Sequence, residues 1–427
     1  MTSEQRKLNT VETKSQESKE WQTRKLDEIA DINLGQSPKG EYYNEVGDGP
    51  HFIQGSKNFG NKYTELERFC SQPKREAKEG DVLISVRAPV GPVNIAPEDL
   101  CIGRGVTALR LNEGSNEFLF YFLKHFEDKW AQFADGTTFN SITKSDLENL
   151  DVPYFPLKER NKIASILSRL DEKIEVNNQI DDILDKIASN LFESWFVDYK
   201  SHNEFKSSKI GDVPPDFSVS SLETVLSFQR GFSYSGDDLI DEESDLEPSD
   251  GYPMINLGTT SPGGGYNADG IKYSRKLPKE RYRIKSGDLV ISHTDMTQDR
   301  KILGSPTLVP ELSQEEMLFS HHLYKVTETN LPVEYLYYYF LSPYFKPKAE
   351  NFASGTTVLS FSSKIASDVH IPIPPQSELD QYVEKVRPLF MKKEMIRKEN
   401  DKIANLRDTL LPNLMSGEIR VDDIKLD

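Results

Sequence analysis

The sequence has few of the residues that mark several common classes of protein. Only two cysteines occur in 427 residues, Cys70 and Cys101, and they lack the CxxC spacing of a thiolate zinc site. No uninterrupted apolar run approaches the roughly 20 residues that cross a bilayer, and residues 1–20 contain no apolar signal segment. We therefore expect a cytoplasmic protein without disulfides, a metal site or a membrane partner.

Catalytic motifs are missing as well. No Gly-Lys dipeptide occurs, which excludes the P-loop that cradles nucleotide phosphates, and no GxGxxG motif follows a predicted strand. The proline pairs in VPPDF (213–217) and IPPQS (373–377) lack the Asn or Asp expected before the catalytic loop of an amino-methyltransferase. His321 and His322 are adjacent, but neighbouring residues of a strand point to opposite faces, so a structural or surface role is expected. The chain is predicted not to be an enzyme.

The charge is acidic overall and uneven along the chain. The net charge of −17 and a pI near 5.0 argue against a protein that coats nucleic acid by bulk attraction. However, the segment 271–285, IKYSRKLPKERYRIK, is a basic run interleaved with tyrosines, whereas 236–250 is almost purely acidic. A basic surface on an acidic molecule and two solvated loops of opposite sign are both compatible with this pattern.

The most informative feature is an internal duplication. The strings GDVLIS (80–85) and GDLVIS (287–292) each read as a turn that leads into a buried strand. Further matches keep the same order: 24–37 with 220–233, 51–56 with 253–258, 121–126 with 337–345, and 136–156 with 355–375. The offset grows along the chain, so the second copy has gained loop residues. Two repeated α/β domains are predicted, in an α+β fold.

A long helix is expected after each copy, over 157–199 and 376–419. Alternating spacings of four and three place apolar residues on one stripe of each helix, with Asn177 and Asp181 as polar exceptions in the first. Pro388 is expected to kink or break the second helix. One such stripe is ordinarily core packing, but two helices that each follow a repeat are better explained as antiparallel partners in a pseudo-twofold arrangement. A helix of about 38 residues would extend about 57 Å. The predicted helix-pair interface comprises Ile163, Leu167, Leu170, Ile174, Leu184, Leu191, Trp195, Val386, Leu389, Ile396, Ile403, Leu410 and Leu414.

These features together resemble the DNA specificity subunit of type I restriction-modification systems. The resemblance covers roughly residues 21–420 and rests on GDVLIS and GDLVIS, on the Gly-Thr-Thr segments that lead into DVPYFP and HIPIPP, on KIASILSRLDEKIEVNNQI with LFESWFVDY, and on LRDTLLPNLMSGEIRV. It implies a polar tail (1–20), a first target-recognition domain (21–156), a central spacer helix (157–205), a second recognition domain (206–375), a C-terminal spacer helix (376–416) and a short tail (417–427).

The resemblance also implies partners and cofactors. Double-stranded DNA would be bound at an asymmetric bipartite target, with one half-site for each domain. Two modification subunits would bring S-adenosylmethionine and methylate adenine, and restriction subunits would use ATP and Mg²⁺ in defence against foreign DNA; this chain would bind no cofactor itself. The alternatives are a methylation-only assembly, a stand-alone methyltransferase or nuclease, and a purely structural coiled-coil linker.

Candidate DNA contacts come from loop-like positions at strand ends, because base edges are read by side-chain donors and acceptors and phosphates by cations. In the first domain they are Gln36, Lys39, Gln54, Lys57, Asn58, Arg87, Thr138 and Asn140. In the second they are Arg230, Tyr234, Asn256, Thr259, His293, Thr294, Gln298, Arg300, Lys301 and Thr357. Phosphate contacts are expected from the basic run, at Lys272, Arg275, Lys276, Lys279, Arg281, Arg283 and Lys285.

Overall fold

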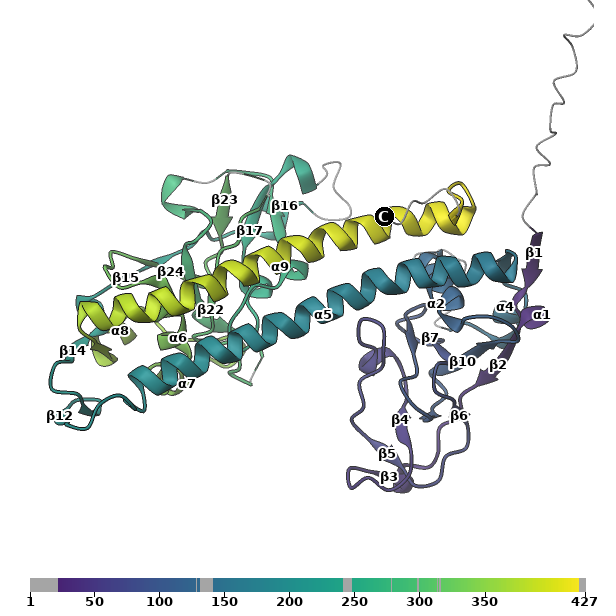
Figure 1. The fold of residues 1–427 in the computed structure, drawn as a ribbon, viewed down its shortest axis with the longest axis horizontal. Helices are drawn as coiled ribbons and strands as arrows, with labels where there is room; N and C mark the ends of the chain where they lie inside the picture. The colour runs from purple at the N-terminus through teal and green to yellow at the C-terminus, as the bar shows by residue number, and fades with distance from the viewer. Residues whose placement is uncertain are drawn as a thin grey trace, which may run out of the picture. The chain divides into compact units, whose positions relative to one another are not determined.

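The computed structural model describes residues 22–127, 129–130, 141–240, 248–277, 279–297, 299–312, 314 and 316–421. The chain divides into two compact units, the first formed by Met1–Val176 with Asn400–Asp427 and the second by Asn177–Glu399. Two long helices, α5 (Leu157–Phe196) and α9 (Gln376–Ser416), contribute to both units (Figure 1). Within the described part of the chain, no helix combines the length and apolarity needed to cross a membrane.

The first unit contains two sheets whose strands are short. The four-stranded sheet is antiparallel, in the order β2 (Ala30–Leu34), β10 (Val106–Leu111), β7 (Val82–Ser85), β8 (Val93–Ile95). The five-stranded sheet has the order β3 (Tyr43–Asn44), β5 (Phe69–Cys70), β4 (His51–Ile53), β9 (Leu100–Ile102), β6 (Glu76–Ala77). Smaller elements complete the unit: β1 (Gln22–Lys25) paired with β11 (Asp151–Tyr154), and the helices α1 (Leu26–Ile29), α2 (Asn116–His125) and α4 (Lys144–Glu148).

The second unit repeats this strand order. Its four-stranded sheet runs β15 (Ser227–Arg230), β24 (Leu323–Thr327), β20 (Leu289–Ser292), β22 (Pro306–Leu308). Its five-stranded sheet runs β16 (Leu239–Ile240), β18 (Lys272–Ser274), β17 (Tyr252–Ile255), β23 (Met317–Phe319), β19 (Arg283–Ile284). Both five-stranded sheets contain one parallel pair, β4 with β9 and β17 with β23. The predicted α+β fold with two repeated domains, each followed by a long helix, is confirmed.

The remaining elements of the second unit pack around these sheets. They are the helices α6 (Val333–Leu341), α7 (Lys346–Phe352) and α8 (Ile365–Asp368), and the strand pairs β12 (Lys206–Ser208) with β13 (Gly211–Val213), β14 (Ser218–Ser221) with β26 (His370–Ile373), and β21 (Thr294–Asp295) with β25 (Leu359–Ser360). Aromatic residues of α6 are buried among side chains of α5 and α9, because the sequence YLYYYF is apolar around the whole helix.

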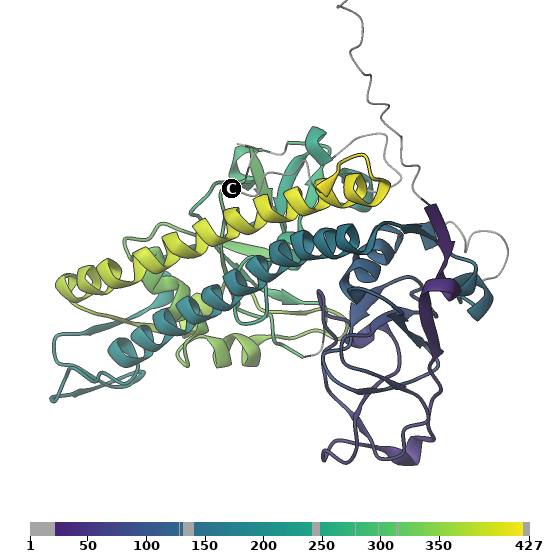
Figure 2. The same cartoon turned by 45° about the vertical axis from the view of Figure 1, so that its right-hand side comes forward.

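The long helices pack antiparallel to each other in each unit (Figures 1 and 2). In the first unit, Ile163 and Leu167 of α5 share a core with Leu414 of α9. In the second, Phe192 and Phe196 share a core with Leu379, Tyr382 and Val386. None of the thirteen residues predicted for the helix pair is exposed.

Two expectations for these helices differ from the structure. The helix α9 runs through Pro388 without a break, because the exposed proline ring faces solvent while Leu389 and Phe390 beside it pack on the core. The helix α5 ends at Phe196, short of residues 199 and 205, and the chain turns at Tyr199, whose φ is 50°.

Polar residues within the helix pair bind one another. In the first unit, the Tyr121 hydroxyl donates to Asp171 of α5 (2.5 Å), and Arg407 of α9 pairs with the same carboxylate (2.7 Å). In the second unit, the Tyr338 hydroxyl donates to Asp185 of α5 (2.9 Å), and Lys393 of α9 pairs with it (2.8 Å). Each domain is therefore joined to both helices through one tyrosine, one aspartate and one cation.

The cysteines take no part in these contacts. Cys70 and Cys101 are free thiols buried beside Phe52. Burial, with the neighbouring Cys70 thiol adding to the effect, raises the pKa of Cys101 to about 12. Because the thiolate is the reactive form, the Cys101 thiol is inert at neutral pH. Among the residues that the structure describes, no cluster of His, Cys, Asp or Glu side chains could hold a metal ion.

Candidate DNA-binding interface

The carboxyl ends of two parallel strands bring two loops together in the first domain. Strands β4 and β9 run in the same direction, so Gln54 after β4 and the turn 103–105 after β9 meet at one sheet edge. The Gly103 amide donates to the Ile53 carbonyl (2.8 Å). A Cβ atom at Gly105 would lie 2.4 Å from the Gln54 carbonyl oxygen, so only glycine allows this approach.

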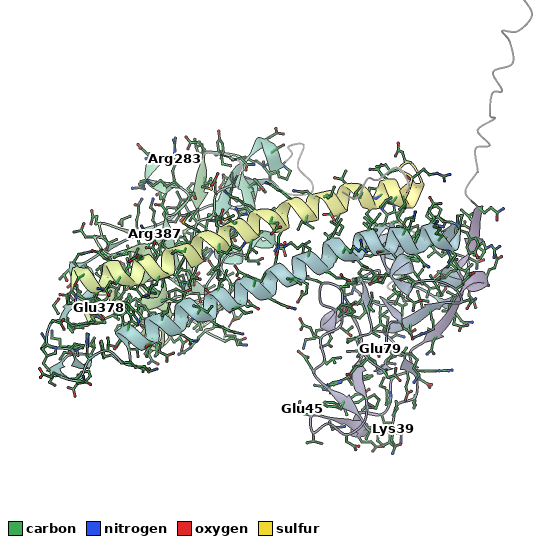
Figure 3. The ribbon with its side chains drawn as sticks, viewed as in Figure 1. Lys39, Glu45, Glu79, Arg283, Glu378 and Arg387 are labelled. Carbon is green, nitrogen blue, oxygen red and sulfur yellow. The ribbon has the colours of Figure 1, made fainter. Side chains whose placement is uncertain are left out.

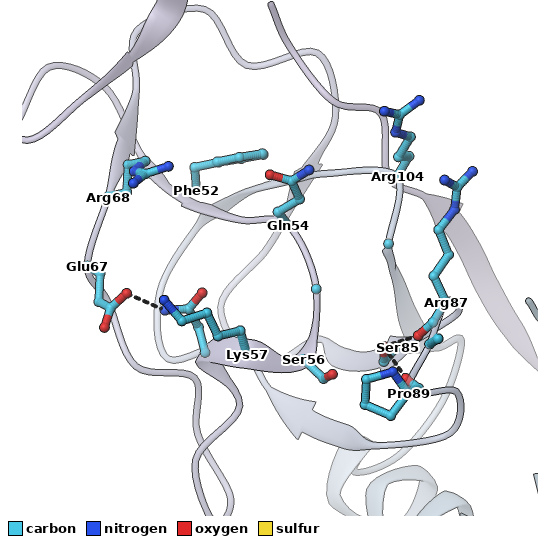
Figure 4. A pocket seen from close by; sticks show the side chains of 14 residues that line it. Phe52, Gln54, Ser56, Lys57, Glu67, Arg68, Ser85, Arg87, Pro89 and Arg104 are labelled. Atoms are coloured by element: carbon cyan, nitrogen blue, oxygen red, sulfur yellow. Dashed lines mark hydrogen bonds between the residues drawn. The ribbon is translucent and has the colours of Figure 1, made fainter. Parts of the chain in front are cut away.

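A cleft of about 670 Å³ opens at this edge (Figure 4). Its walls are the loop after β4, the short 3₁₀ turn Ser56–Asn58, the loop after β7 and the turn 103–105. The lining residues are Phe52, Gln54, Gly55, Ser56, Lys57, Asn58, Glu67, Arg68, Ser85, Arg87, Ala88, Pro89, Arg104 and Gly105.

The serine shared by the two GD-strand repeats holds the loop that follows it. The buried Ser85 hydroxyl donates to the carbonyl oxygens of Arg87 (3.0 Å) and Pro89 (2.8 Å). Its counterpart Ser292, also buried, donates to the carbonyl of Ile302. The serine therefore fixes the start of each loop, and the residues after it are free to differ between the copies.

The cleft is basic although the whole chain is acidic. Lys57, Arg68, Arg87 and Arg104 line it, and no described residue lies within ion-pair distance of any of them. The single acidic lining residue, Glu67, accepts a hydrogen bond from the Asn58 amide (2.9 Å). Cations that lack an internal partner attract an anion from outside, and side-chain amides beside them can read base edges.

Four of the residues predicted in the first domain line this cleft, namely Gln54, Lys57, Asn58 and Arg87. Gln36 is exposed and its backbone N–H donates to the Ile102 carbonyl (3.0 Å), next to the turn 103–105. Lys39 lies beside β3 (Figure 3), pairs with Glu41 (3.5 Å) and is not part of the lining. Thr138 and Asn140 lie outside the described residues.

Sequence reasoning missed Arg68 and Arg104. Both are exposed loop residues of the cleft. Arg104 stands in Gly-Arg-Gly directly after an apolar strand, a pattern that could have identified a tight turn with an outward cation. No feature of the sequence indicated Arg68, because its place in the cleft depends on the pairing of β5 with β4.

In the second domain, four candidates have their side chains engaged inside the protein. Asn256 and Thr259 cap a 3₁₀ turn, where the Asn256 amide accepts from Gly258 and donates to the carbonyls of Met254 and Gly270. The imidazole of His293 stacks on Tyr324 (4.0 Å between centroids), and Thr294 bonds His322 (3.0 Å). All four are buried, and each forms a hydrogen bond inside the domain.

The other candidates of the second domain lie at or near the surface. Arg230 is exposed and its Nε donates to the His321 carbonyl (3.0 Å). Arg300 has a φ of 60° and binds the Glu350 carbonyl (3.0 Å). Lys301 and Thr357 are exposed and Tyr234 is half-buried, while Gln298 lies outside the described residues.

The cations of the basic run differ in whether a carboxylate or carbonyl binds them. Lys276 pairs with Asp238 (3.0 Å) and Arg275 donates to the Leu239 carbonyl (2.7 Å). Arg283, labelled in Figure 3, pairs with Glu316 (3.0 Å). One ion pair, between Asp238 and Lys276, therefore connects the acidic segment to the basic run. Lys272, Lys279, Arg281 and Lys285 are exposed and form no ion pair with a described residue, and Arg281 lies over the Tyr282 ring (4.5 Å).

A family model described as "Type I restriction modification DNA specificity domain" matches the chain over residues 18–186 and 216–405. These two spans make up most of the chain. The protein belongs to this family of DNA specificity subunits. Membership confirms that this specificity subunit recognises DNA targets and is not itself catalytic. Partner subunits of type I systems use S-adenosylmethionine and ATP.

Individual relatives agree with this membership. The type I restriction enzyme MjaIX specificity subunit of Methanocaldococcus jannaschii is 26% identical over 432 residues, which is 95% of each chain. The putative MjaX specificity subunit of the same organism is 40% identical over 162 residues, 38% of each chain. The crystal structure of a type I system S subunit from M. genitalium covers 94% of this specificity subunit and 97% of that chain, with 19% identity and a TM-score of 0.55, and shares the fold.

Proposed function

We propose that this specificity subunit reads an asymmetric bipartite DNA target, with one half-site bound by each domain. The observation that carries the proposal is the basic cleft of the first domain, in which Lys57, Arg68, Arg87 and Arg104 lack ion-pair partners among the described residues of a chain of net charge −17. The two domains share strand order but differ in the loops that follow the shared serine, so their half-sites should differ in sequence.

Each side chain of the first interface has a role suited to its chemistry. An arginine binds guanine O6 and N7 in a bidentate manner, and an amide binds adenine N6 and N7. Arg87 and Arg104 are thus proposed for guanine, Gln54 and Asn58 for adenine, and Lys57 and Arg68 for phosphate. Gln36, Lys39, Thr138 and Asn140 remain predictions.

The second interface is assigned to exposed residues. Arg230, Tyr234, Arg300, Lys301 and Thr357 are proposed as DNA contacts, with Gln298 as a remaining prediction. Phosphate contacts are proposed for Lys272, Lys279, Arg281 and Lys285, because the other cations of the basic run already bind a carboxylate or carbonyl inside the domain.

The proposed assembly follows from family membership. Two modification subunits would use S-adenosylmethionine to methylate adenine at each half-site, and restriction subunits would use ATP and Mg²⁺, all in the cytoplasm. The chain itself would determine where on the DNA these activities take place. Residues 21–156 and 206–375 are proposed as the recognition domains, with the two long helices as the spacer between half-sites.

The test is single-molecule sequencing of methylated adenines in DNA from cells that carry the chain with its modification subunit, compared with cells that lack only the chain. A bipartite motif that disappears with the chain is the expected result. If the complex assembles and the methylation pattern does not depend on the chain, the proposal is wrong.

A further inference from the structure

The turn after β9 in the first domain has a definite set of hydrogen bonds. Its first residue, Gly103, donates its amide to the Ile53 carbonyl at the end of β4 (2.8 Å). Its last residue, Gly105, accepts a bond from the Val86 amide after β7 (2.9 Å). These bonds hold the middle residue, Arg104, at the wall of the basic cleft.

The turn after β23 in the second domain has the same bonds. The Ser320 amide donates to the Ile255 carbonyl at the end of β17 (2.8 Å), and the His322 carbonyl accepts from the His293 amide after β20 (3.1 Å). By this pattern, His321 takes the place that Arg104 has in the first domain. His322 takes the place of a glycine and adds a second ring.

The Nδ1 atom of each ring faces the protein. Nδ1 of His322 bonds the Thr294 hydroxyl (3.0 Å), and Nδ1 of His321 is buried with no hydrogen-bond partner in the described part of the chain. A buried N–H without an acceptor is rarer than a buried lone pair without a donor, which favours the proton of His321 on Nε2. No described residue forms a hydrogen bond with Nε2 of either ring.

The surroundings pack against the two rings and favour their neutral form. The rings lie 4.0 Å apart between centroids, and Tyr234 packs edge-on against His321 (5.6 Å). Burial, reinforced by the other histidines and Arg230, lowers the pKa of His322 to about 4, and burial also lowers the pKa of His321. With the Thr294 hydroxyl as the donor to Nδ1 of His322, that ring also carries its proton on Nε2, and a neutral imidazole of this form is a hydrogen-bond donor at physiological pH.

We propose that His321 and His322 are specificity-determining residues of the second domain, whose Nε2 atoms bind acceptors on the base edges of its half-site. The acceptors that suit such donors in the major groove are purine N7, guanine O6 and thymine O4. The first domain thus presents a guanidinium at this turn, and the second presents two neutral rings. This inference rests on the proposed function of the two domains.

The test uses the complex of this chain with its modification subunit and the adenine-methylation motif found for the unaltered chain. In one variant, His321→Asn with His322→Asn, the amide retains a polar atom near the position of Nδ1 but stops short of Nε2. In a second, His321→Gln with His322→Gln, the longer side chain reaches about as far as Nε2. The control is His370→Asn, a half-buried histidine of the same domain on β26. A fourth variant, Arg104→Ala, marks the half-site of the first domain.

We expect the double Asn variant to relax one half of the motif and to lower methylation at intact target sites about tenfold, as the loss of one good base contact would. The relaxed half should be the one that Arg104→Ala leaves unchanged. The double Gln variant should retain more activity, and His370→Asn should match the unaltered chain. Thermal unfolding verifies that each variant folds, and the single variant His321→Asn replaces the double variant if the latter does not.

An intact motif in the folded Asn variant would overturn the inference and leave the proposed function standing. Relaxation of the same half by both the Asn variant and Arg104→Ala would also overturn it. Absence of any bipartite motif with the unaltered chain would instead contradict the proposed function itself.

Discussion

At the scale of single residues, Arg104 offers the most direct test of the basic cleft. Replacing it with alanine removes a cation that has no ion-pair partner in the described part of the chain, so folding should be unaffected. The assembled complex should lose about tenfold in affinity for target DNA, since one good base contact is worth roughly 1–3 kcal/mol. Titration of a labelled duplex measures this, with Lys144→Ala as the control because Lys144 pairs with Glu148 (2.6 Å). Equal losses in the two variants would argue against the cleft as a DNA site.

A second residue-scale prediction concerns acid stability. Burial lowers the pKa of His293 to about 4, whereas an unfolded histidine titrates near 6.5. Below about pH 6.5 this histidine is protonated in the unfolded chain but stays neutral in the folded chain. The free energy of unfolding therefore falls between about pH 6.5 and 4, by at most about 3 kcal/mol. Urea unfolding should show a shallower loss in His293→Phe, which retains an aromatic ring against Tyr324 but cannot titrate. The same pH slope in both proteins would contradict this assignment.

Individual side chains also show which features of the site the sequence did not predict. Gln54 and Arg87 were chosen as candidate DNA contacts because they follow strands, and the structure places both in the lining of one cleft, since loops after strands lie at a sheet edge. The same reasoning placed Asn256 and His293 on the surface, yet both are buried. Whether a strand-end side chain points inward depends on which strand lies beside it, and the parallel pairing of β17 with β23 is not visible in the sequence.

At the scale of elements, the contact of the first domain with both helices can be tested at Arg407. Its side chain pairs with Asp171, which also accepts from Tyr121, and both charged groups are largely buried. Arg407→Met would leave the carboxylate with one donor and should cost about 2 kcal/mol, less than for a fully buried pair. Lys398→Met is the control, because its partner Glu311 is exposed and such pairs contribute about 0–1 kcal/mol. Similar unfolding free energies for the two variants would show that the buried contact adds nothing.

In the same helix, a substitution at Pro388 should raise the stability of the protein. Pro388 stands inside α9, exposed to solvent, and cannot donate a backbone hydrogen bond. Pro388→Ala restores that donor and should stabilise the protein by about 1–3 kcal/mol. Thermal unfolding checks this, with Pro412→Ala, another exposed proline of α9, as a comparison nearer the helix end. A lower melting temperature for Pro388→Ala would mean that the proline fits a geometry that alanine does not adopt.

At the scale of the whole molecule, duplication made much of the fold predictable. The sequence segments that match between the two copies occur in the same order, which predicted the same strands in both domains. The apolar spacings of four and three predicted two long helices that pack together. The loops were not predictable in the same way, since they are where the two copies differ. The second copy has gained residues there, and the basic run folds back on its acidic neighbour through Lys276 and Asp238.

The charge of the whole molecule leads to a final prediction about its dependence on partners. A net charge of −17 repels DNA at long range, while the four cations of the first cleft attract it only locally. The isolated chain should therefore bind DNA weakly at 150 mM salt, and the complex with its modification subunits should bind far more tightly. Fluorescence anisotropy with a labelled duplex at 50 and 200 mM salt measures both, and the complex should show the steeper salt dependence because it neutralises more phosphates. Tight, sequence-selective binding by the isolated chain at 200 mM salt would instead show that its own loops overcome the acidic surface without help.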